Sequence, residues 1–459
     1  MQYSIVNYKT VKENSDFRID ADYYHPEKLN SFLILKNNSD QILNDIAISV
    51  KNNEKPKDLN VEIYDTTSAS LHILTKNLSQ KEERVSIKRK AKKGDIIISR
   101  LRPYLKQVAY IPTFIDKAYL TTEFFVLRSR NNENISFLLP FLLTKYVQNI
   151  LFWGQGGTEH PRFQEYDLLG LPVVKIKKLK ETLNNLVFKC CKLILDSENY
   201  YSQAEQLLLS ELGLLDWKPK HESTFVKNYS DIQTAERFDA EYFQPKYEEI
   251  IEAVKKYKGG FDELGNFVKI KDKNFTPKDN ERYKYIELAN ISSNGEINGY
   301  TENFGNELPS RARRKVQKGN LIISSIEGSL ESIALITEDW KNALCSTGFF
   351  AVNSDIINSE TLLVLLKTKI GQLQLKKGCK GTILTAIGKD ELSKIVLPKI
   401  DLKTQEEIKK KITEMYETKK TSKSLLEIAK RGVEIAIEKD EQEAEKWIEE
   451  KLKEIKVEI

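Results

Sequence analysis

Residues 18–26 read RIDADYYHP and residues 237–245 read RFDAEYFQP, so one nine-residue pattern occurs twice in this chain of 459 residues. The two occurrences start 237 − 18 = 219 positions apart. A second pattern repeats with nearly the same offset: KGDIIIS at 93–99 matches KGNLIIS at 318–324, and 318 − 93 = 225. Solenoid repeats are about 20–50 residues long, so this much longer period indicates a duplicated domain.

The order of the remaining motifs is also the same in both copies. Each copy has a Thr-x-Phe-Phe stretch, an apolar helix-like segment, a Gly-Thr loop and a strand with a Leu-Pro pair. The members are Thr122, Phe124, Phe125, Thr158 and Pro172 in the first copy, and Thr347, Phe349, Phe350, Thr382 and Pro398 in the second. Short β-rich runs with a single helix near the end of each copy predict an α+β domain whose small sheet is twisted or barrel-like.

A charged, helix-forming segment follows each copy and carries apolar residues at steps of three and four. The expected core positions are Leu179, Leu183, Leu186, Leu193, Ile408, Ile412, Met415, Leu426 and Val433. Each stripe packs either on its own domain or on the other helix. Two matched stripes of about 30 residues, some 45 Å long, favour an antiparallel coiled coil that holds the two domains apart at a fixed distance.

The motifs divide the chain into five predicted segments. They are a first domain at 1–176, a long spacer helix at 177–215, a linker at 216–234, a second domain at 235–400, and a second long helix with a helical tail at 401–459.

Composition excludes several classes of protein. The net charge of +5 is too small to indicate a nucleic-acid-binding protein by itself. No signal-peptide pattern and no run of about 18 apolar residues is present, so we expect a cytoplasmic protein. The four cysteines form no CxxC pair and the four histidines are scattered, so no metal site is predicted.

Local charge is more informative than net charge. Residues 86–93 read SIKRKAKK and the matching residues 311–318 read RARRKVQK, with five basic and no acidic residues in each. A single run of this kind usually marks a solvated face. Two runs at equivalent places suggest an element that faces DNA phosphates, since Lys and Arg position a DNA-binding protein through the backbone. The candidates are Lys88, Arg89, Lys90, Lys92, Lys93, Arg311, Arg313, Arg314 and Lys315.

The residues after the repeated strand differ between the copies, as two different base sequences would require. Arginine suits guanine O6 and N7, and a carboxylate suits cytosine N4. Glycine lets backbone approach a ligand, so the Gly-Thr loops are further candidates, although a plain helix-to-strand connection explains them equally well. The candidates are Arg100, Arg102, Tyr104, Lys106, Thr158, Arg162, Ser325, Glu327, Lys380 and Thr382; taken singly, each also fits an ordinary turn residue.

Motifs for catalysis are missing from the sequence. There is no Walker A pattern, no complete dinucleotide-binding glycine fingerprint, no Asn-Pro-Pro-aromatic tetrapeptide and no nucleophile elbow. Any catalysis is therefore expected from another chain.

The paired order of these motifs resembles the specificity subunits of type I restriction-modification systems, and the resemblance spans nearly the whole chain. It implies two target-recognition domains, arranged with pseudo-twofold symmetry, that each read one half of a bipartite site in double-stranded DNA, with the helices setting the spacing. It implies a non-catalytic chain whose partners are two methyltransferase (modification) subunits and ATP-dependent restriction subunits. The methyltransferases would modify adenine after base flipping. S-adenosylmethionine, ATP and magnesium are accordingly expected only in the partners.

The resemblance carries the repeated nine-residue motif over as a framework or partner-facing element, because a base-reading residue should differ between copies. Its residues are Arg18, Asp20, Tyr23, Tyr24, Arg237, Asp239, Tyr242 and Phe243. The first motif departs from the second at His25, where Gln244 stands in the other copy. Two alternatives stay open: a duplicated-domain protein scaffold without sequence-specific DNA binding, and an orphan subunit or half of a related single-chain restriction enzyme.

Overall fold

The repeated KGD and KGN triplets form the same turn before the same strand. Gly94 and Gly319 both have φ of +85°, a conformation that glycine adopts readily. The next side chain, Asp95 or Asn320, closes the turn by accepting a hydrogen bond from the backbone three residues earlier, at 2.9 Å and 3.1 Å. The turn leads into a fully buried strand, β6 (Ile96–Ser99) in the first copy and β16 (Leu321–Ser324) in the second.

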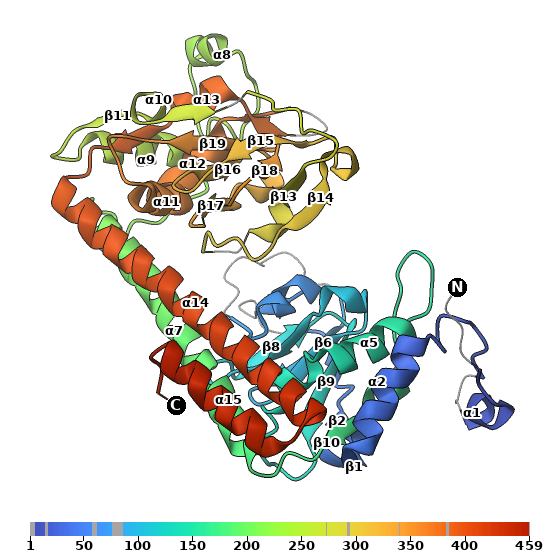
Figure 1. Ribbon diagram of the computed structural model, residues 1–459. Coiled ribbons are helices and arrows are strands. Elements are labelled where there is room, and N and C mark those ends of the chain that lie inside the picture. Colours follow the sequence, from blue (N-terminus) through green and yellow to red (C-terminus); the bar gives the residue numbers. More distant parts are fainter. Residues whose placement is uncertain are drawn as a thin grey trace. The chain divides into compact units, whose positions relative to one another are not determined.

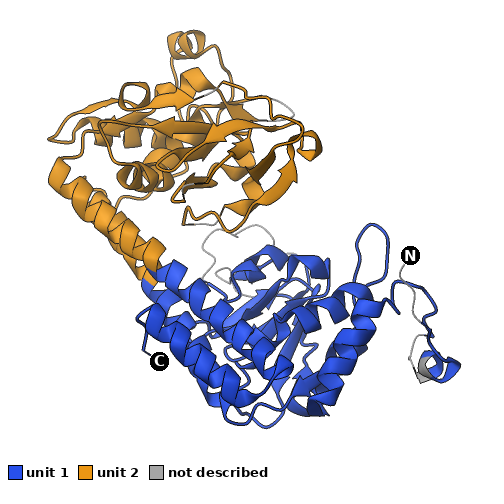
Figure 2. Ribbon diagram, viewed as in Figure 1, with its two compact units in different colours: residues 1–196, 418–459 blue, residues 197–417 orange. Residues whose placement is uncertain are grey.

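The structure is a computed structural model, and it describes residues 5–13, 17–56, 62–75, 86–271, 273–291, 294–338, 340–381 and 385–458. The chain forms two compact units (Figure 2). Unit 1 comprises residues 1–196 and 418–459, and unit 2 comprises residues 197–417. The units assign each half of a long helix to the domain on which it packs, whereas the sequence partition treats the helices as separate segments.

Unit 1 contains two four-stranded sheets and a two-stranded one (Figure 1). The first sheet has the order β2 (Ala47–Ser49), β9 (Phe124–Ser129), β6 and β7 (Val108–Tyr110). The second has the order β3 (Asn53–Glu54), β5 (Lys88–Lys92), β8 (Lys117–Leu120) and β4 (Ile63–Tyr64). The small sheet pairs β1 (Ser39–Ile42) with β10 (Pro172–Val174).

Unit 2 repeats this arrangement. Its first sheet has the order β12 (Lys269–Lys271), β19 (Phe349–Asn353), β16 and β17 (Ile333–Leu335). Its second has the order β14 (Thr301–Phe304), β13 (Arg282–Ile286), β18 (Ala343–Ser346) and β15 (Ala312–Val316). Two small sheets pair β11 (Phe261–Glu263) with β22 (Val396–Pro398), and β20 (Cys379–Lys380) with β21 (Ala386–Ile387).

The register of the strands is duplicated as well as their order. Ser99 lies opposite Phe124 in unit 1, and Ser324 lies opposite Phe349 in unit 2, so both pairs keep the offset of 225. Each second sheet contains one parallel pair, β4 with β8 and β13 with β18. The copies differ in the outer strand of this sheet, which is β3 beside β5 in unit 1 and β14 beside β13 in unit 2. As far as the structure describes the strands, the sheets are open and none closes into a barrel.

Both units also contain short helices. Those of unit 1 are α1 (Tyr8–Glu13), α2 (Pro26–Asn37), α3 (Leu43–Ile46), α4 (Leu138–Leu142), α5 (Lys145–Gly154), α6 (Glu165–Leu169) and α15 (Glu441–Glu454). Those of unit 2 are α8 (Tyr229–Ala235), α9 (Pro245–Lys255), α10 (Leu264–Phe267), α11 (Ser359–Lys367), α12 (Lys369–Lys377) and α13 (Lys389–Ser393). Short 3₁₀ helices are η1 (Thr66–Leu71) and η2 (Pro103–Leu105) in unit 1, and η3 (Leu288–Asn290), η4 (Gly305–Glu307) and η5 (Glu327–Ser329) in unit 2.

The prediction of a single helix near the end of each copy was wrong. The apolar stretch breaks at Thr144 in unit 1 and at Thr368 in unit 2, which gives the pairs α4–α5 and α11–α12. Both threonines have extended ψ, near 150° and 169°, and Thr144 caps α5 by accepting a hydrogen bond from the Val147 amide. In addition, Pro26 and Pro245, which end the nine-residue motif, start α2 and α9 at the position where proline is favoured.

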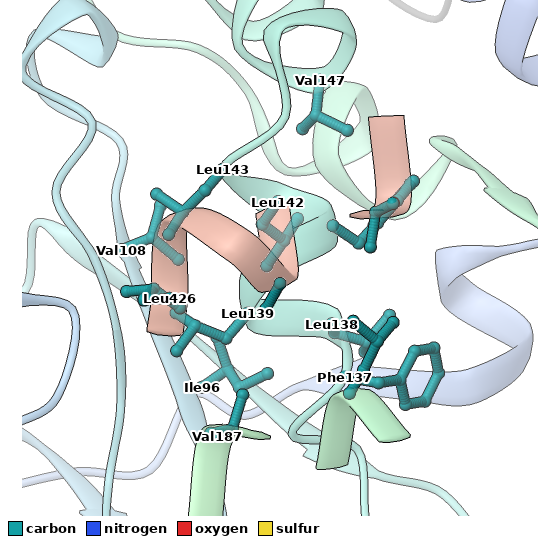
Figure 3. Close-up of a cluster of buried hydrophobic side chains, with 14 of the residues drawn as sticks. Ile96, Val108, Phe137, Leu138, Leu139, Leu142, Leu143, Val147, Val187 and Leu426 are labelled. Atoms are coloured by element: carbon teal, nitrogen blue, oxygen red, sulfur yellow. The ribbon is translucent and has the colours of Figure 1, made fainter. Parts of the chain in front are cut away.

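Two long helices follow the copies, α7 (Leu179–Glu211) with 33 residues and α14 (Leu402–Glu438) with 37. In unit 1, Val187 and Leu426 pack with Leu139 and Leu142 in one buried cluster (Figure 3). In unit 2, Ala204 and Leu208 of α7 share a cluster with Ile408, Ile412 and Met415 of α14. The apolar stripes therefore pack both on each other and on their own domain.

The two helices are antiparallel. Cys190 of α7 contacts Ser422 of α14 in unit 1, and the Lys411 ammonium of α14 lies 5.3 Å from the centre of the Tyr200 ring of α7 in unit 2. Residue numbers therefore decrease along α14 in the direction in which they increase along α7. Of the predicted core positions, Leu193 is only partly buried. The others are buried: Leu179, Leu183, Leu186, Ile408, Ile412, Met415, Leu426 and Val433. The stripe is wider than a strict heptad, because α7 must face a domain as well as a helix.

The last helix, α15, packs on the core of unit 1. Ala444, Ile448 and Leu452 are buried at helical spacing, and Trp447 packs against the same cluster. None of the described helices combines the length and apolarity that crossing a bilayer requires.

Candidate nucleic-acid interface

The nine-residue motif forms the same clamp in both units, and in unit 1 it centres on Arg18. The Arg18 guanidinium donates two hydrogen bonds of 2.8 Å to the Asp20 carboxylate. It also donates to the backbone carbonyls of Gly154 and Gln155, at 2.7 Å and 3.0 Å. The guanidinium carbon of Arg18, Cζ, lies 4.3 Å from the centre of the Tyr23 ring. The hydrogen bond from Arg18 holds the pKa of Asp20 below its ordinary value.

Arg237 makes the equivalent contacts in unit 2. It donates to Asp239 at 2.7 Å and 3.0 Å, and to the carbonyls of Lys377 and Cys379 at 3.3 Å and 2.9 Å. Its distance to the Tyr242 ring is again 4.3 Å. In both units the motif therefore ties the start of the domain to the C-terminal end of a short helix, α5 in unit 1 and α12 in unit 2, and to the residues directly after it. Tyr24 and Phe243, the neighbouring aromatic residues, are buried. These contacts give the motif a framework role within each unit.

Three loops of unit 1 are joined through their backbones beside this clamp. The Arg100 amide donates to the Glu123 carbonyl at 3.0 Å. The Arg102 amide donates to the Pro161 carbonyl at 2.8 Å, and the Phe163 amide donates to the Arg100 carbonyl at 3.2 Å. We call this arrangement the first loop platform; it consists of residues 100–106, 121–123 and 155–162.

Unit 2 contains the same three backbone bonds. The Ser325 amide donates to the Gly348 carbonyl at 2.9 Å, the Glu327 amide to the Thr385 carbonyl at 3.0 Å, and the Ile387 amide to the Ser325 carbonyl at 2.8 Å. The second loop platform consists of residues 325–329, 346–348, 380–381 and 385–386. Each position matches its counterpart at an offset of 225 or 224, so the two platforms share one backbone scaffold.

The side chains on this scaffold differ from one copy to the other. Arg100 corresponds to Ser325, Arg102 to Glu327, Glu123 to Gly348 and Arg162 to Ala386. Backbone hydrogen bonds hold the loops whatever the side chains are. The platforms can therefore present different chemistry at equivalent positions, which is the arrangement that readout of two different base sequences needs.

A charged cluster dominates the first loop platform. The Glu123 carboxylate accepts two hydrogen bonds from Arg162, at 2.8 Å and 2.9 Å, and one of 3.1 Å from Nε of Arg100. The Arg162 guanidinium also donates to the His160 carbonyl at 2.9 Å. The Arg162 hydrogen bonds, with those from Arg100, lower the pKa of Glu123 from 4.5 to about 2. The carboxylate is therefore ionised at every physiological pH.

The remaining candidates on this platform are accessible. Tyr104, Lys106 and Thr158 are exposed and Arg102 is partly exposed. Arg102 and Lys106 flank η2 with left-handed backbone, at φ of 50° and 51°. Such a conformation is uncommon for residues with a side chain, and it turns the chain sharply on both sides of Tyr104.

The candidates of the second platform are less basic. The Ser325 hydroxyl donates to the Gly348 carbonyl at 3.0 Å, and Glu327 is partly exposed. The Lys380 ammonium pairs with Glu391 at 3.2 Å. Thr382, a further candidate, lies outside the described residues.

The charge pattern of residues 86–93, the first basic octet, suggested one exposed surface that faces DNA phosphates. The structure shows that only part of this octet is exposed. Lys88 and Arg89 are buried in β5, and the Arg89 guanidinium donates to the Phe124 carbonyl and to the Asn53 side chain. Lys90 pairs with Glu54 at 2.9 Å. Lys92 and Lys93 are exposed, and Lys93 pairs with Asp116 at 2.8 Å.

The second octet is also divided between two roles. Arg311 is exposed and Arg313 donates to the Ser310 carbonyl at 3.0 Å. The Lys315 ammonium lies 3.7 Å from the centre of the Phe275 ring. Arg314 is partly buried in β15, at the position opposite Cys345. A strand alternates its side chains between two faces, so a run of charges in a strand cannot all point the same way.

Sequence reasoning missed Glu123, the residue that joins Arg100 to Arg162. The signal was present in the aligned stretches TTEFFVL and STGFFAV, where a carboxylate stands in one copy and Gly348 in the other. In the part of the chain that the structure describes, no group of three or more His, Cys, Asp or Glu side chains is placed to hold a metal ion.

No protein-family model matches the chain, and no curated protein matches it. Among solved structures, a chain from a study of complex assembly and conformational transition of the type I R-M system is similar over 89% of this chain and 96% of its own, with 15% identity and a TM-score of 0.29. The HsdS subunit from Thermoanaerobacter tengcongensis is similar over 85% and 96%, with 15% identity and a TM-score of 0.28. The type I restriction-modification system S subunit from M. genitalium is similar over 87% and 96%, with 14% identity and a TM-score of 0.33.

Proposed function

We propose that this chain is the DNA sequence-specificity subunit of a type I restriction-modification complex. Each unit acts as a target-recognition domain that reads one half of a bipartite site in double-stranded DNA. The chain itself is non-catalytic. Two methyltransferase subunits bring S-adenosylmethionine, and restriction subunits bring ATP-dependent cleavage with its magnesium.

The observation that carries this proposal is the pair of loop platforms. Six backbone hydrogen bonds, three in each unit, hold the two platforms in the same way. Residues that serve only the fold would be expected to stay alike in both copies, as Arg18 and Arg237 do. The platform side chains instead change in charge, from Arg102 to Glu327 and from Glu123 to Gly348. A protein that reads two unlike half-sites needs this combination of shared frame and divergent contacts.

The long helices supply the second requirement of the proposal, a fixed spacing between half-sites. An α-helix rises 1.5 Å per residue, so α7 and α14 are rods of roughly 50 Å. We propose that their antiparallel pairing sets the number of base pairs between the half-sites. The methyltransferase subunits would dock on these helices and on the adjacent domain edges.

Phosphate contacts are assigned to the exposed basic residues alone. Lys92, Lys93 and Lys106 in unit 1 and Arg311 in unit 2 are exposed. Contacts of this kind give affinity without sequence preference, and each adds to the dependence of binding on salt. Lys88 and Arg89 are assigned to the fold because they are buried.

The test is to assemble the chain with its methyltransferase partner, methylate a library of random DNA, and sequence the modified sites. The proposal expects a bipartite motif with a constant spacer. It also expects the tightest binding to duplexes that carry both half-sites, with affinity falling as salt rises. Methylation without sequence preference, or modification of the same sites when this chain is left out, would refute the proposal. Salt-independent association with other proteins and none with DNA would favour the scaffold alternative.

A further inference from the structure

Glu123 is placed to control the orientation of an arginine that reads DNA. It lies in the turn before β9, and its carboxylate binds two guanidinium groups from two different loops. The equivalent position in unit 2 is Gly348, so the cluster belongs to one target-recognition domain only.

The two arginines are held in different ways. Arg162 uses Nε and Nη2 on Glu123 and Nη1 on the His160 carbonyl, so all three of its nitrogens are engaged. Arg100 uses only Nε, at 3.1 Å from the carboxylate. Within the described residues, neither terminal nitrogen of Arg100 donates a hydrogen bond to the protein. Arg100 is therefore held at Nε while its two terminal nitrogens stay available to a ligand, and 36% of its side chain is exposed.

The available end of Arg100 matches the chemistry of one base. The two terminal nitrogens of arginine donate parallel hydrogen bonds, and guanine offers O6 and N7 as paired acceptors in the major groove. A flexible arginine loses conformational freedom when it binds, whereas one anchored at Nε has lost part of it already. The Glu123 charge is itself neutralised by Arg162, so the carboxylate repels DNA phosphates less than an unpaired one would.

We propose that Glu123 is a positioning residue that sets guanine specificity in the first target-recognition domain: it anchors Arg100 at Nε so that the terminal nitrogens read O6 and N7, with Arg162 bracing the carboxylate. The inference rests on the proposed function and names the base that one position of one half-site should contain. The second domain, with Ser325 and Gly348 at these places, reads its half-site by other contacts.

The experiment measures base preference at each position of both half-sites, using the complex with its methyltransferase partner and duplex libraries. Arg100→Ala should reduce the preference for guanine at one position by about tenfold, the discrimination typical of one bidentate contact. Glu123→Gly, which installs the residue of unit 2, should cause a similar loss at that same position. Glu123→Gln should cause a smaller loss, because the amide keeps an acceptor oxygen. The second half-site should be unchanged in all three variants.

A double-mutant cycle separates positioning from a merely structural role. If Glu123 acts through Arg100, the double variant Glu123→Gln with Arg100→Ala should show the same preference as Arg100→Ala alone. Glu449→Gln is the matched control: it removes the same charge from an exposed residue of α15, outside the loop platform, and should change nothing.

Three results would overturn the inference. One is an unchanged guanine preference in folded Glu123→Gly. Another is additive losses in the double variant, which would show that Glu123 does not act through Arg100. Equal losses at both half-sites together with a lower melting temperature would also overturn it, because they would assign Glu123 to stability alone. A wild-type complex without any sequence preference would instead refute the proposed function, so the two failures are distinguishable.

Discussion

Cys190 of α7 and Ser422 of α14 exchange hydrogen bonds across the helix pair. The Ser422 hydroxyl donates to the Cys190 carbonyl at 3.3 Å, and the Cys190 thiol donates to the Ser422 carbonyl at 3.4 Å. Both side chains are buried, and burial raises the pKa of Cys190 to about 12. A reciprocal contact of this kind fixes the register of two antiparallel helices, because a shift of either helix would leave buried polar groups without partners.

The helix pair can be lengthened without disturbing this register. Four residues inserted after Asp196, together with four inserted after Glu417, keep the helix contacts inside each unit and extend both helices by about 6 Å. The expected result is a spacer longer by about two base pairs, at 3.4 Å per base pair, with both half-site sequences retained. Methylation profiling of the variant complex provides the measurement. An unchanged spacer would contradict the role of the helices in setting the spacing.

Arg89 and Lys93 lie in the same basic octet but should respond differently to substitution. Arg89→Ala removes a buried donor to the Phe124 carbonyl, and we expect a loss of about 2 kcal/mol in the free energy of unfolding. Lys93→Ala breaks an exposed ion pair with Asp116 and should change stability by less than about 0.5 kcal/mol. Urea denaturation of both variants provides the comparison. Equal effects would contradict the division of the octet between fold and surface.

Lys93 should instead affect DNA binding. Its replacement should weaken binding to all sequences alike and flatten the salt dependence by about one unit of slope, provided that it contacts a phosphate.

The Glu123 cluster predicts a specific pH dependence of stability. The Glu123 pKa is about 2 in the folded unit against 4.5 in an ordinary environment. A lowered carboxylate pKa contributes stability that is fully present above pH 4.5 and is lost as the pH falls towards 2. The difference in unfolding free energy between wild type and Glu123→Gln should therefore shrink between pH 4.5 and 2, and stay constant above this window. Urea titrations at several pH values measure this difference, with Glu449→Gln as the control.

Arg102 offers a substitution that changes recognition without harming the fold. Its backbone is left-handed, with φ of 50°, so Arg102→Gly removes the side chain while relaxing the backbone. We expect stability to remain equal or to rise by about 0.5 kcal/mol. Base preference should change at the first half-site only. A uniform loss of affinity for all sequences would reassign Arg102 to phosphate contact.

The duplication made much of the fold predictable from sequence. Two strands of the same buried character follow the same KGD or KGN turn, and both long helices show their apolar stripes. The break at Thr144 was not predictable by the same means, because apolar residues continue on both sides of it and periodicity does not register a single capping threonine.

The candidate site was only partly predictable. The divergence after the repeated strand falls in loops that the backbone hydrogen bonds join into the platforms. The contact of Glu123 with Arg162 was not visible, because it joins residues 39 positions apart through backbone pairing that no local pattern encodes. The burial of Arg89 was missed for a different reason: a count of charges does not tell which face of a strand each one occupies.

The division of the chain into units has a consequence for its synthesis. Unit 2 is one continuous segment, residues 197–417, whereas unit 1 needs residues 418–459 to complete its core. A ribosome makes the chain from its N-terminus, and domains fold as units once their residues have emerged. Unit 2 is therefore complete while the first unit still lacks Leu426 and Val433 and exposes the apolar face of α7. The domain that is synthesised first is therefore the one that finishes folding last.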